Sequence, residues 1–148
     1  MVEQTAQLDD HDHRLLALWA ADCAEHVLPY FEAPAPNDER PRRAIEAGRA
    51  WVRGEIKMSE ARTAAFAAHA AARATVDTAA RATARASGHA AATAHVARHA
   101  AHAAAYAVAA AMAAAGAPAA ATEREWQYQH LPERLRSFAS PDQNNRKI

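Results

Sequence analysis

The 148-residue chain has little cysteine, glycine or aromatic residue, and no surplus of charge of either sign. Its single cysteine, Cys23, excludes an internal disulfide framework and fits a reducing compartment. The 17 lysines and arginines are balanced by 17 aspartates and glutamates. A nucleic-acid binder needs a surplus of basic side chains to neutralise phosphates, so this balance argues against nucleic acid as a partner.

The chain also lacks a long, strongly apolar run. Its first 14 residues are polar and acidic, without the apolar centre of a signal peptide. The longest apolar run, 103–121, is mostly alanine and is interrupted by Gly116 and Pro118. Alanine gains little from leaving water, so no membrane span is expected. We therefore expect a cytoplasmic protein with no membrane partner.

Strand patterns are nearly absent, whereas alanine, a strong helix former, occupies 46 positions. Apolar residues recur at steps of three and four, which is the spacing of one helix face. Glycine, proline and capping residues divide the chain into five expected helices. These cover about 8–31, 38–54, 59–88, 89–115 and 122–137, with a break in the third near 74–77.

This pattern predicts an all-α fold, a single-domain antiparallel bundle over residues 1–148 with flexible ends at 1–7 and 139–148. The third and fourth helices form an alanine-rich central pair, because alanine faces allow helices to approach closely. The first, second and fifth helices carry the larger side chains and are expected to wrap this pair.

Three stretches of the chain carry a recognisable pattern, namely LWAADCAEHVLPYFE (18–32), DERPRRAIEAGRAWVRGEI (38–56) and GHAAATAHVARHA (88–100). The segment AFAAHAAARA (65–74) is similar, so the likeness spans nearly the whole chain. Together they resemble a bacterial family labelled putative immunity protein. The second stretch is the most specific, because its charged string is hard to reach by compositional bias. The resemblance implies a small all-α cytoplasmic antidote to a toxin deployed between bacteria, and it implies no catalytic residues.

On one continuous fourth helix, His95, His99, His102 and Tyr106 would share a single face. His95 and His99 have the spacing that lets two imidazoles reach one metal ion, and His102 lies one turn further on. The stripe is therefore a candidate site for a divalent transition metal or a small ligand. A complete metal site would need further ligands from a facing helix.

Candidate ligand-binding residues on other helices are Asp22, Glu25 and His26 on the first helix and His69 on the third. Nine histidines in the chain make chance pairs at this spacing common. A histidine in an alanine-rich bundle can equally serve as a medium-sized wedge that hydrogen-bonds to a neighbour. Cys23 beside His26 is better explained as a small core residue than as a nucleophile.

Three functions remain open on the sequence alone. The leading one, from the resemblance, is an immunity or binding protein that contacts a cognate toxin. The second is a small helical-bundle enzyme or a metal or small-ligand binder that uses the histidines of the fourth helix, in a biosynthetic pathway. The third is a structural module that forms homo-oligomers. Convergence of His95 and His99 on a polar pocket facing the first helix would favour the second function.

Overall fold

The computed structural model describes residues 8–139, and this part of the chain is helical, with no strand. The all-α class expected from the sequence is confirmed. The described residues form seven α-helices and one 3-10 helix rather than five helices. In chain order these are α1 (Asp10–Val27), α2 (Pro29–Glu32), α3 (Arg40–Val52), α4 (Met58–Arg73), α5 (Thr78–Ala92), α6 (His99–Ala115), α7 (Ala117–Gln129) and η1 (Glu133–Ala139).

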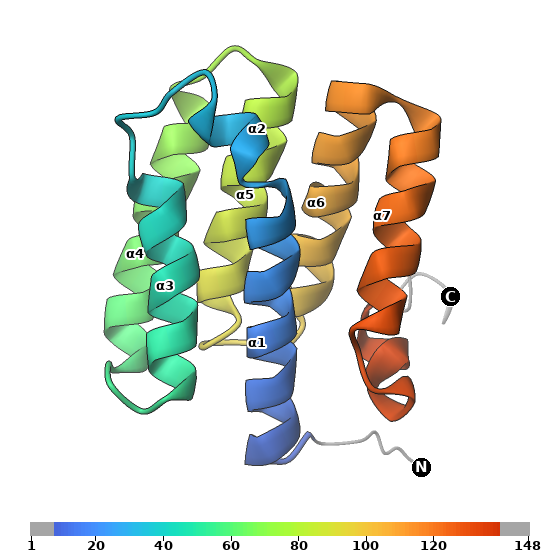
Figure 1. Ribbon diagram of the computed structural model, residues 1–148. Helices are drawn as coiled ribbons and strands as arrows, with labels where there is room; N and C mark the ends of the chain where they lie inside the picture. The colour runs from blue at the N-terminus through green and yellow to red at the C-terminus, as the bar shows by residue number, and fades with distance from the viewer. Residues whose placement is uncertain (1–7, 140–148) are drawn as a thin grey trace, which may run out of the picture.

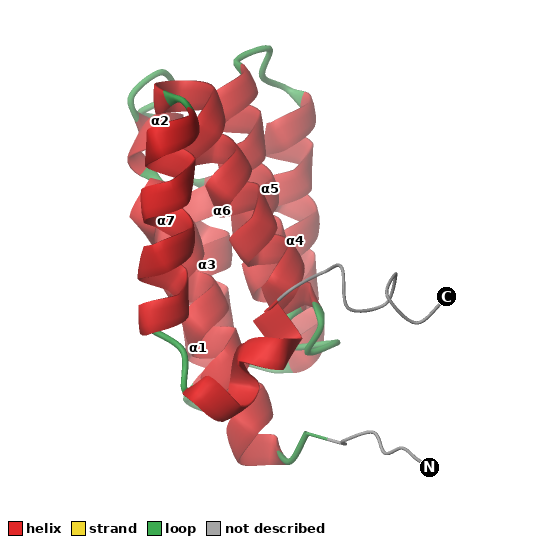
Figure 2. Cartoon of the chain, turned by 90° about the vertical axis from the view of Figure 1, so that its right-hand side faces the viewer, coloured by secondary structure: helices red, strands yellow, loops and turns green. Residues whose placement is uncertain are grey.

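The long helices are arranged in two layers (Figure 1). In one layer α5 lies between α4 and α6 and packs against both. In the other, α3 packs on α4 and α5, while α1 packs on α5 and α6. The helix α7 packs on α6, and Figure 2 shows it on the opposite side of the molecule from α4. The layer of α4, α5 and α6 is thus covered by α1 and α3 on one face only.

Local chemistry explains three of the helix boundaries. The carboxylate of Asp9 accepts a hydrogen bond from the Asp12 backbone N–H (2.8 Å), and that of Asp77 accepts one from Ala80 (2.8 Å), which caps α1 and α5. Gly116 has a φ of 88°, a conformation that favours glycine, and it separates α6 from α7. Each of these ends follows from a residue type visible in the sequence.

The third and fourth helices differ from expectation. The break expected near 74–77 is complete, so the segment 59–88 belongs to two helices. Gly88, expected to end a helix, lies buried inside α5, which continues to Ala92. The chain turns at 93–98 instead, where the Thr93 carbonyl accepts a hydrogen bond from Nε2 of His13 (2.6 Å). This turn contains neither glycine nor proline, so nothing in the local sequence marks it.

The last expected helix, 122–137, is also divided. The helix α7 starts earlier, directly after Gly116, and ends at Gln129. Pro132 cannot donate a backbone hydrogen bond, and the chain continues after it as the 3-10 helix η1. The expected flexible ends lie mostly outside the described residues, at 1–7 and 140–148, whereas Ala139 is the last residue of η1.

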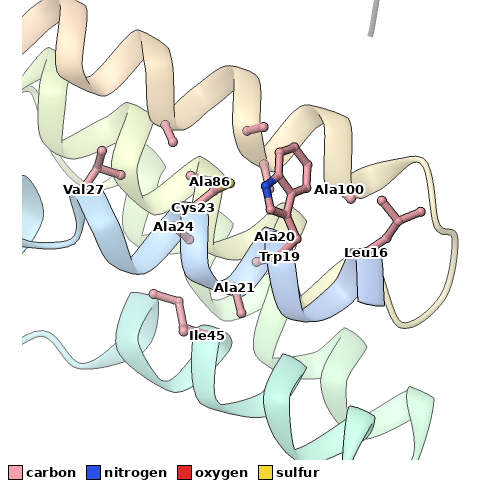
Figure 3. Close-up of a cluster of buried hydrophobic side chains, with 14 of the residues drawn as sticks. Leu16, Trp19, Ala20, Ala21, Cys23, Ala24, Val27, Ile45, Ala86 and Ala100 are labelled. Atoms are coloured by element: carbon pink, nitrogen blue, oxygen red, sulfur yellow. The ribbon is translucent and has the colours of Figure 1, made fainter. Parts of the chain in front are cut away.

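The core lies where α1 meets α3, α5 and α6 (Figure 3). Trp19 points from α1 toward α6, and its indole N–H donates to the Gln127 carbonyl of α7 (2.9 Å). Ile45 points from α3 toward α1, where the small side chains of α1 leave room for it. Each buried carbon contributes only about 0.8 kcal/mol, and an alanine side chain buries a single carbon. Much of the hydrophobic stabilisation of the core therefore comes from these larger side chains.

The expected wrapped central pair of alanine-rich helices was wrong. The alanine-rich helices are the three-helix layer of α4, α5 and α6, and its uncovered face carries partly exposed side chains. Within residues 8–139, no helix combines the length and the hydropathy that crossing a membrane would require.

Candidate functional site

The structure places His95 in the turn between α5 and α6, where its side chain is exposed. The expected stripe assumed that the helix ran unbroken from His89 to Ala115, and this was wrong. His99, His102 and Tyr106 do lie together on α6, at spacings of three and four residues. His95 therefore does not stack one turn before His99 on a common helix face.

A cluster of four imidazoles forms where α4, α5 and α6 meet on the uncovered face, and we call it the histidine cluster: His69, His89, His99 and His102. The ring of His89 lies at its centre, with centroids 5.1 Å from both His69 and His99 and 5.3 Å from His102. Its Nδ1 lies 3.0 Å from Nδ1 of His99, so one ring donates a hydrogen bond to the other. Tyr106 stacks nearly parallel on His89, 5.3 Å away.

The position of His69 depends on Gly88. Its imidazole lies directly over this glycine, where an added Cβ would stand 2.7 Å from the ring. Nδ1 of His69 accepts a hydrogen bond from the Arg85 guanidinium (2.8 Å), which puts the ring proton on Nε2. Gly88 and Arg85 on α5 thus hold a histidine of α4 against the cluster.

Burial and nearby positive charge lower the pKa values of three cluster rings, those of His69, His89 and His99. Burial, followed by the charges of His69, His99, His102 and Arg85, lowers the pKa of His89 to about 3. Burial also lowers the pKa of His69, with Arg85 and Arg73 adding to the effect, and that of His99, with His102 adding to it. These three rings are therefore neutral at pH 7 and act as hydrogen-bonding groups rather than as cations.

Two features of the cluster bear on metal binding. The Nδ1 atoms of His89 and His99 come close enough to share an ion, yet His89 was not among the expected ligands. Over residues 8–139, no group of three or more His, Cys, Asp or Glu side chains is arranged to hold a metal ion. The metal site expected at His95, His99 and His102 stays a prediction.

The candidate residues of the first helix point elsewhere. Asp22 and Glu25 both accept hydrogen bonds from one guanidinium, that of Arg49 on α3, at 2.7 and 2.6 Å. They therefore join α1 to α3 and do not face the histidine cluster. Of the expected candidates outside α6, the structure brings only His69 to that cluster.

His26 belongs to a separate arrangement between α1 and α7. Its Nδ1 lies 2.7 Å from the carboxylate of Glu123, which is almost fully buried. Trp126 stacks on the same imidazole with centroids 3.9 Å apart, and His130 stacks on the other side of Trp126. The carboxylate orients the ring, so this pair joins two helices and leaves half of His26 exposed.

Cys23 is a core residue. It is fully buried, and burial raises the pKa of its thiol well above the ordinary value, with Glu123 and Asp22 adding to the effect. A neutral, inaccessible thiol is a poor nucleophile, which agrees with the packing role expected from the sequence.

Three residues of these arrangements escaped sequence reasoning: His89, Arg85 and Glu123. Arg85 precedes His89 by four residues on α5, a spacing that signals a shared helix face once both are placed on one helix. Glu123 carries no such local signal, because its partner His26 is 97 residues away in the chain.

An open cavity lies at the other end of the α5–α6 pair, where α2 meets the first turn of α5 and the last turn of α6. It is lined in part by Pro29, Tyr30, Thr78 and Ala113. Asp77 also borders it, but its carboxylate is used to cap α5. None of the site residues expected from the sequence lines this cavity.

Comparison with known protein families identifies the family to which this chain is similar. The family described as Imm-5 like putative immunity protein matches residues 6–134, which is most of the chain. No curated protein and no solved structure matches this chain. The match agrees with the resemblance carried by segments 18–32, 38–56 and 88–100. The chain belongs to the Imm-5 like putative immunity protein family.

Proposed function

We propose that this protein neutralises a toxin by binding to it, as a non-enzymatic immunity protein in the bacterial cytoplasm. Membership of the immunity protein family over residues 6–134 is the observation that carries this proposal. In this account the chain is a single antiparallel bundle that presents a preformed helical surface to the toxin. A rigid surface loses little conformational entropy on binding, which favours affinity.

The geometry supports binding over catalysis. The expected catalytic partners are divided among three places: the histidine cluster, the Arg49 bridge and the His26–Glu123 pair. The thiol of Cys23 is buried, and the central histidine of the cluster is too weak a base to work near neutral pH.

The test is growth protection. Toxin domains encoded in the same genome are expressed one at a time in a bacterial host, with and without this chain. We expect growth arrest by one of them to be relieved, and the two proteins to co-purify at a fixed ratio. Relief without a complex would favour an enzyme that modifies the toxin or its product, and no relief by the full set would contradict the proposal.

A second candidate function is capture of a transition metal or a small ligand by the histidine cluster. The 3.0 Å approach of Nδ1 of His89 to Nδ1 of His99 favours it, since both nitrogens could turn toward one ion. Elemental analysis of tag-free protein, before and after zinc addition and dialysis, tests it. Stoichiometric zinc that is lost in His89→Gln would support this function, whereas protein that stays metal-free would exclude zinc.

A further inference from the structure

The neutral net charge conceals a division of charge along the chain. Residues 61–122 contain five arginines and a single carboxylate, Asp77, which leaves a formal charge of +4. The remainder of the chain has the other 12 basic and 16 acidic residues and therefore carries −4. Five of the nine histidines also fall in the basic segment. This segment builds α4, α5 and α6, the layer that α1 and α3 cover on one face only.

Helical spacing places most of the arginines and histidines of residues 61–122 on the uncovered face of this layer. On each helix they follow one another at three- or four-residue steps, and ring contacts join the three helices at His89. We call this surface the basic face. It comprises Arg62, Phe66, His69 and Arg73 on α4, Arg81, Arg85 and His89 on α5, and His99, His102 and Tyr106 on α6.

Among residues 8–139, the arginines of the basic face have no acidic partner. In the part of the chain that the structure describes, no ion pair involves any arginine between residues 61 and 122. Arg62 lies over the Phe66 ring (5.7 Å), and Arg81 donates to the Thr75 carbonyl. On α3, by contrast, Arg42, Arg43 and Arg49 all pair with carboxylates.

Exposed aromatic rings border these cations. Phe66 is 60% exposed and Tyr106 37% exposed. Aromatic residues and arginine are the side chains most enriched where proteins bind each other, because rings bury large areas and guanidinium groups bind carboxylates at two points. The basic face therefore has the composition of an interface whose other half is acidic.

We infer that the basic face is the surface on which an acidic face of a partner protein docks. That this partner is a toxin rests on the function proposed above. Carboxylates of the partner would bind Arg62, Arg73 and Arg81, and an apolar side chain would cover the exposed ring of Phe66. A nucleic acid is a poorer occupant, because the remainder of the chain is acidic and would repel a long polyanion.

A defined acidic probe tests the inference without the toxin. The full chain, labelled with 15N, is titrated with a glutamate-rich peptide containing one leucine and, separately, with a single-stranded oligonucleotide. The variant Arg62→Glu/Arg81→Glu reverses two exposed charges near helix N-termini, where acidic residues are favourable, so it should fold. Arg43→Glu is the matched control, because Arg43 is the fourth residue of α3 as Arg81 is of α5.

We expect peptide-induced shifts on α4, α5 and α6, and about tenfold weaker binding by the double variant, which corresponds to about 1.4 kcal/mol. Arg43→Glu should bind as the wild type does. Any of four results would overturn the inference. These are no binding of the peptide, shifts centred on α1 and α3, a loss of peptide affinity in Arg43→Glu equal to that of the double variant, or tighter binding of the oligonucleotide than of the peptide. Growth protection by the wild type would survive any of these results, so the proposed function is tested separately.

Discussion

At Gly88 the absence of a side chain decides where His69 lies. A methyl group there would stand 2.7 Å from the imidazole, so the ring can rest on α5 only while this position is glycine. Arg85 then fixes the ring through its Nδ1. A glycine within an alanine-rich helix, which costs stability, is explained by this contact.

We predict that Gly88→Ala displaces the His69 ring while the protein stays folded. The displaced ring becomes more exposed, so its lowered pKa should rise toward the ordinary value, measured by NMR titration. The gain in helix propensity, up to about 1 kcal/mol, is partly lost to the displaced contact. In a His69→Ala background the same change should show the full gain in the free energy of unfolding. An unchanged His69 pKa in Gly88→Ala would contradict this account.

At the scale of the helices, a missing side chain at Gly48 lets α3 approach the backbone of α5. A Cβ added at Gly48 would lie 3.4 Å from the carbonyl oxygen of Ala90, whose position is fixed by the α5 backbone. Small residues on both helices thus allow their backbones to approach. The contact matters to the site, because α3 supports α5 on the face opposite to the histidine cluster.

We predict that Gly48→Val lowers the free energy of unfolding by about 1–3 kcal/mol, because its methyl groups would enter the α5 backbone. At about 2–4 °C per kcal/mol, thermal unfolding should show a clear fall in Tm. Glu46→Val introduces the same residue at an exposed position of α3 and should change stability by no more than about 0.5 kcal/mol. Equal losses in the two variants would refute close packing of α3 on α5.

Element boundaries show how far sequence reasoning reaches. Asp77 and Gly116 carry chemistry that ends or caps a helix, and the structure has boundaries at both. Gly88 is also a residue type that ends helices, but here it makes room for the His69 ring within α5. The turn that does end α5 follows Ala92, and a hydrogen bond from His13 of α1 stabilises it. Local sequence cannot reveal a boundary that a distant residue stabilises, and this error placed His95 on a helix although it lies in the turn between α5 and α6.

The same limit applies to the site. Helical spacing correctly brought His99, His102 and Tyr106 to one face, because those residues lie on one helix. It could not show that Asp22 and Glu25 turn to Arg49, since this depends on how α1 packs against α3.

For the molecule as a whole, the depressed pKa values of the histidine cluster predict acid sensitivity. A histidine with a lower pKa in the folded state than in the unfolded state binds its proton mainly after unfolding. Its contribution to stability is therefore complete above the ordinary value of 6.5 and is lost as the pH falls toward about 3, the folded pKa of His89.

We predict that Tm falls between pH 7.5 and 5.5, a range in which carboxylates stay ionised. His89→Gln removes the most depressed group and should reduce this fall, even if it also lowers Tm at pH 7.5. His130→Gln, at an exposed histidine outside the cluster, should leave the fall unchanged. A Tm that is independent of pH over this range in the wild type would contradict neutral cluster histidines.

The chain has a neutral net charge, but residues 61–122 carry +4 and the remainder carries −4. This division of charge gives a member of the immunity protein family a surface suited to an acidic partner. One side of the layer formed by α4, α5 and α6 packs against α1 and α3, and the other exposes arginines that have no acidic partner within the described range 8–139. The function proposed above requires such a surface, because a protein that neutralises a toxin by binding must cover part of it.

Growth protection by charge-reversed variants tests this claim most directly. With a toxin that the wild type neutralises, the account predicts that Arg43→Glu protects the host fully while Arg62→Glu/Arg81→Glu loses protection although it remains folded and abundant. Full protection by the double variant would contradict the basic face as the toxin-binding surface, and failure of the wild type against every toxin domain of the same genome would contradict the immunity function itself.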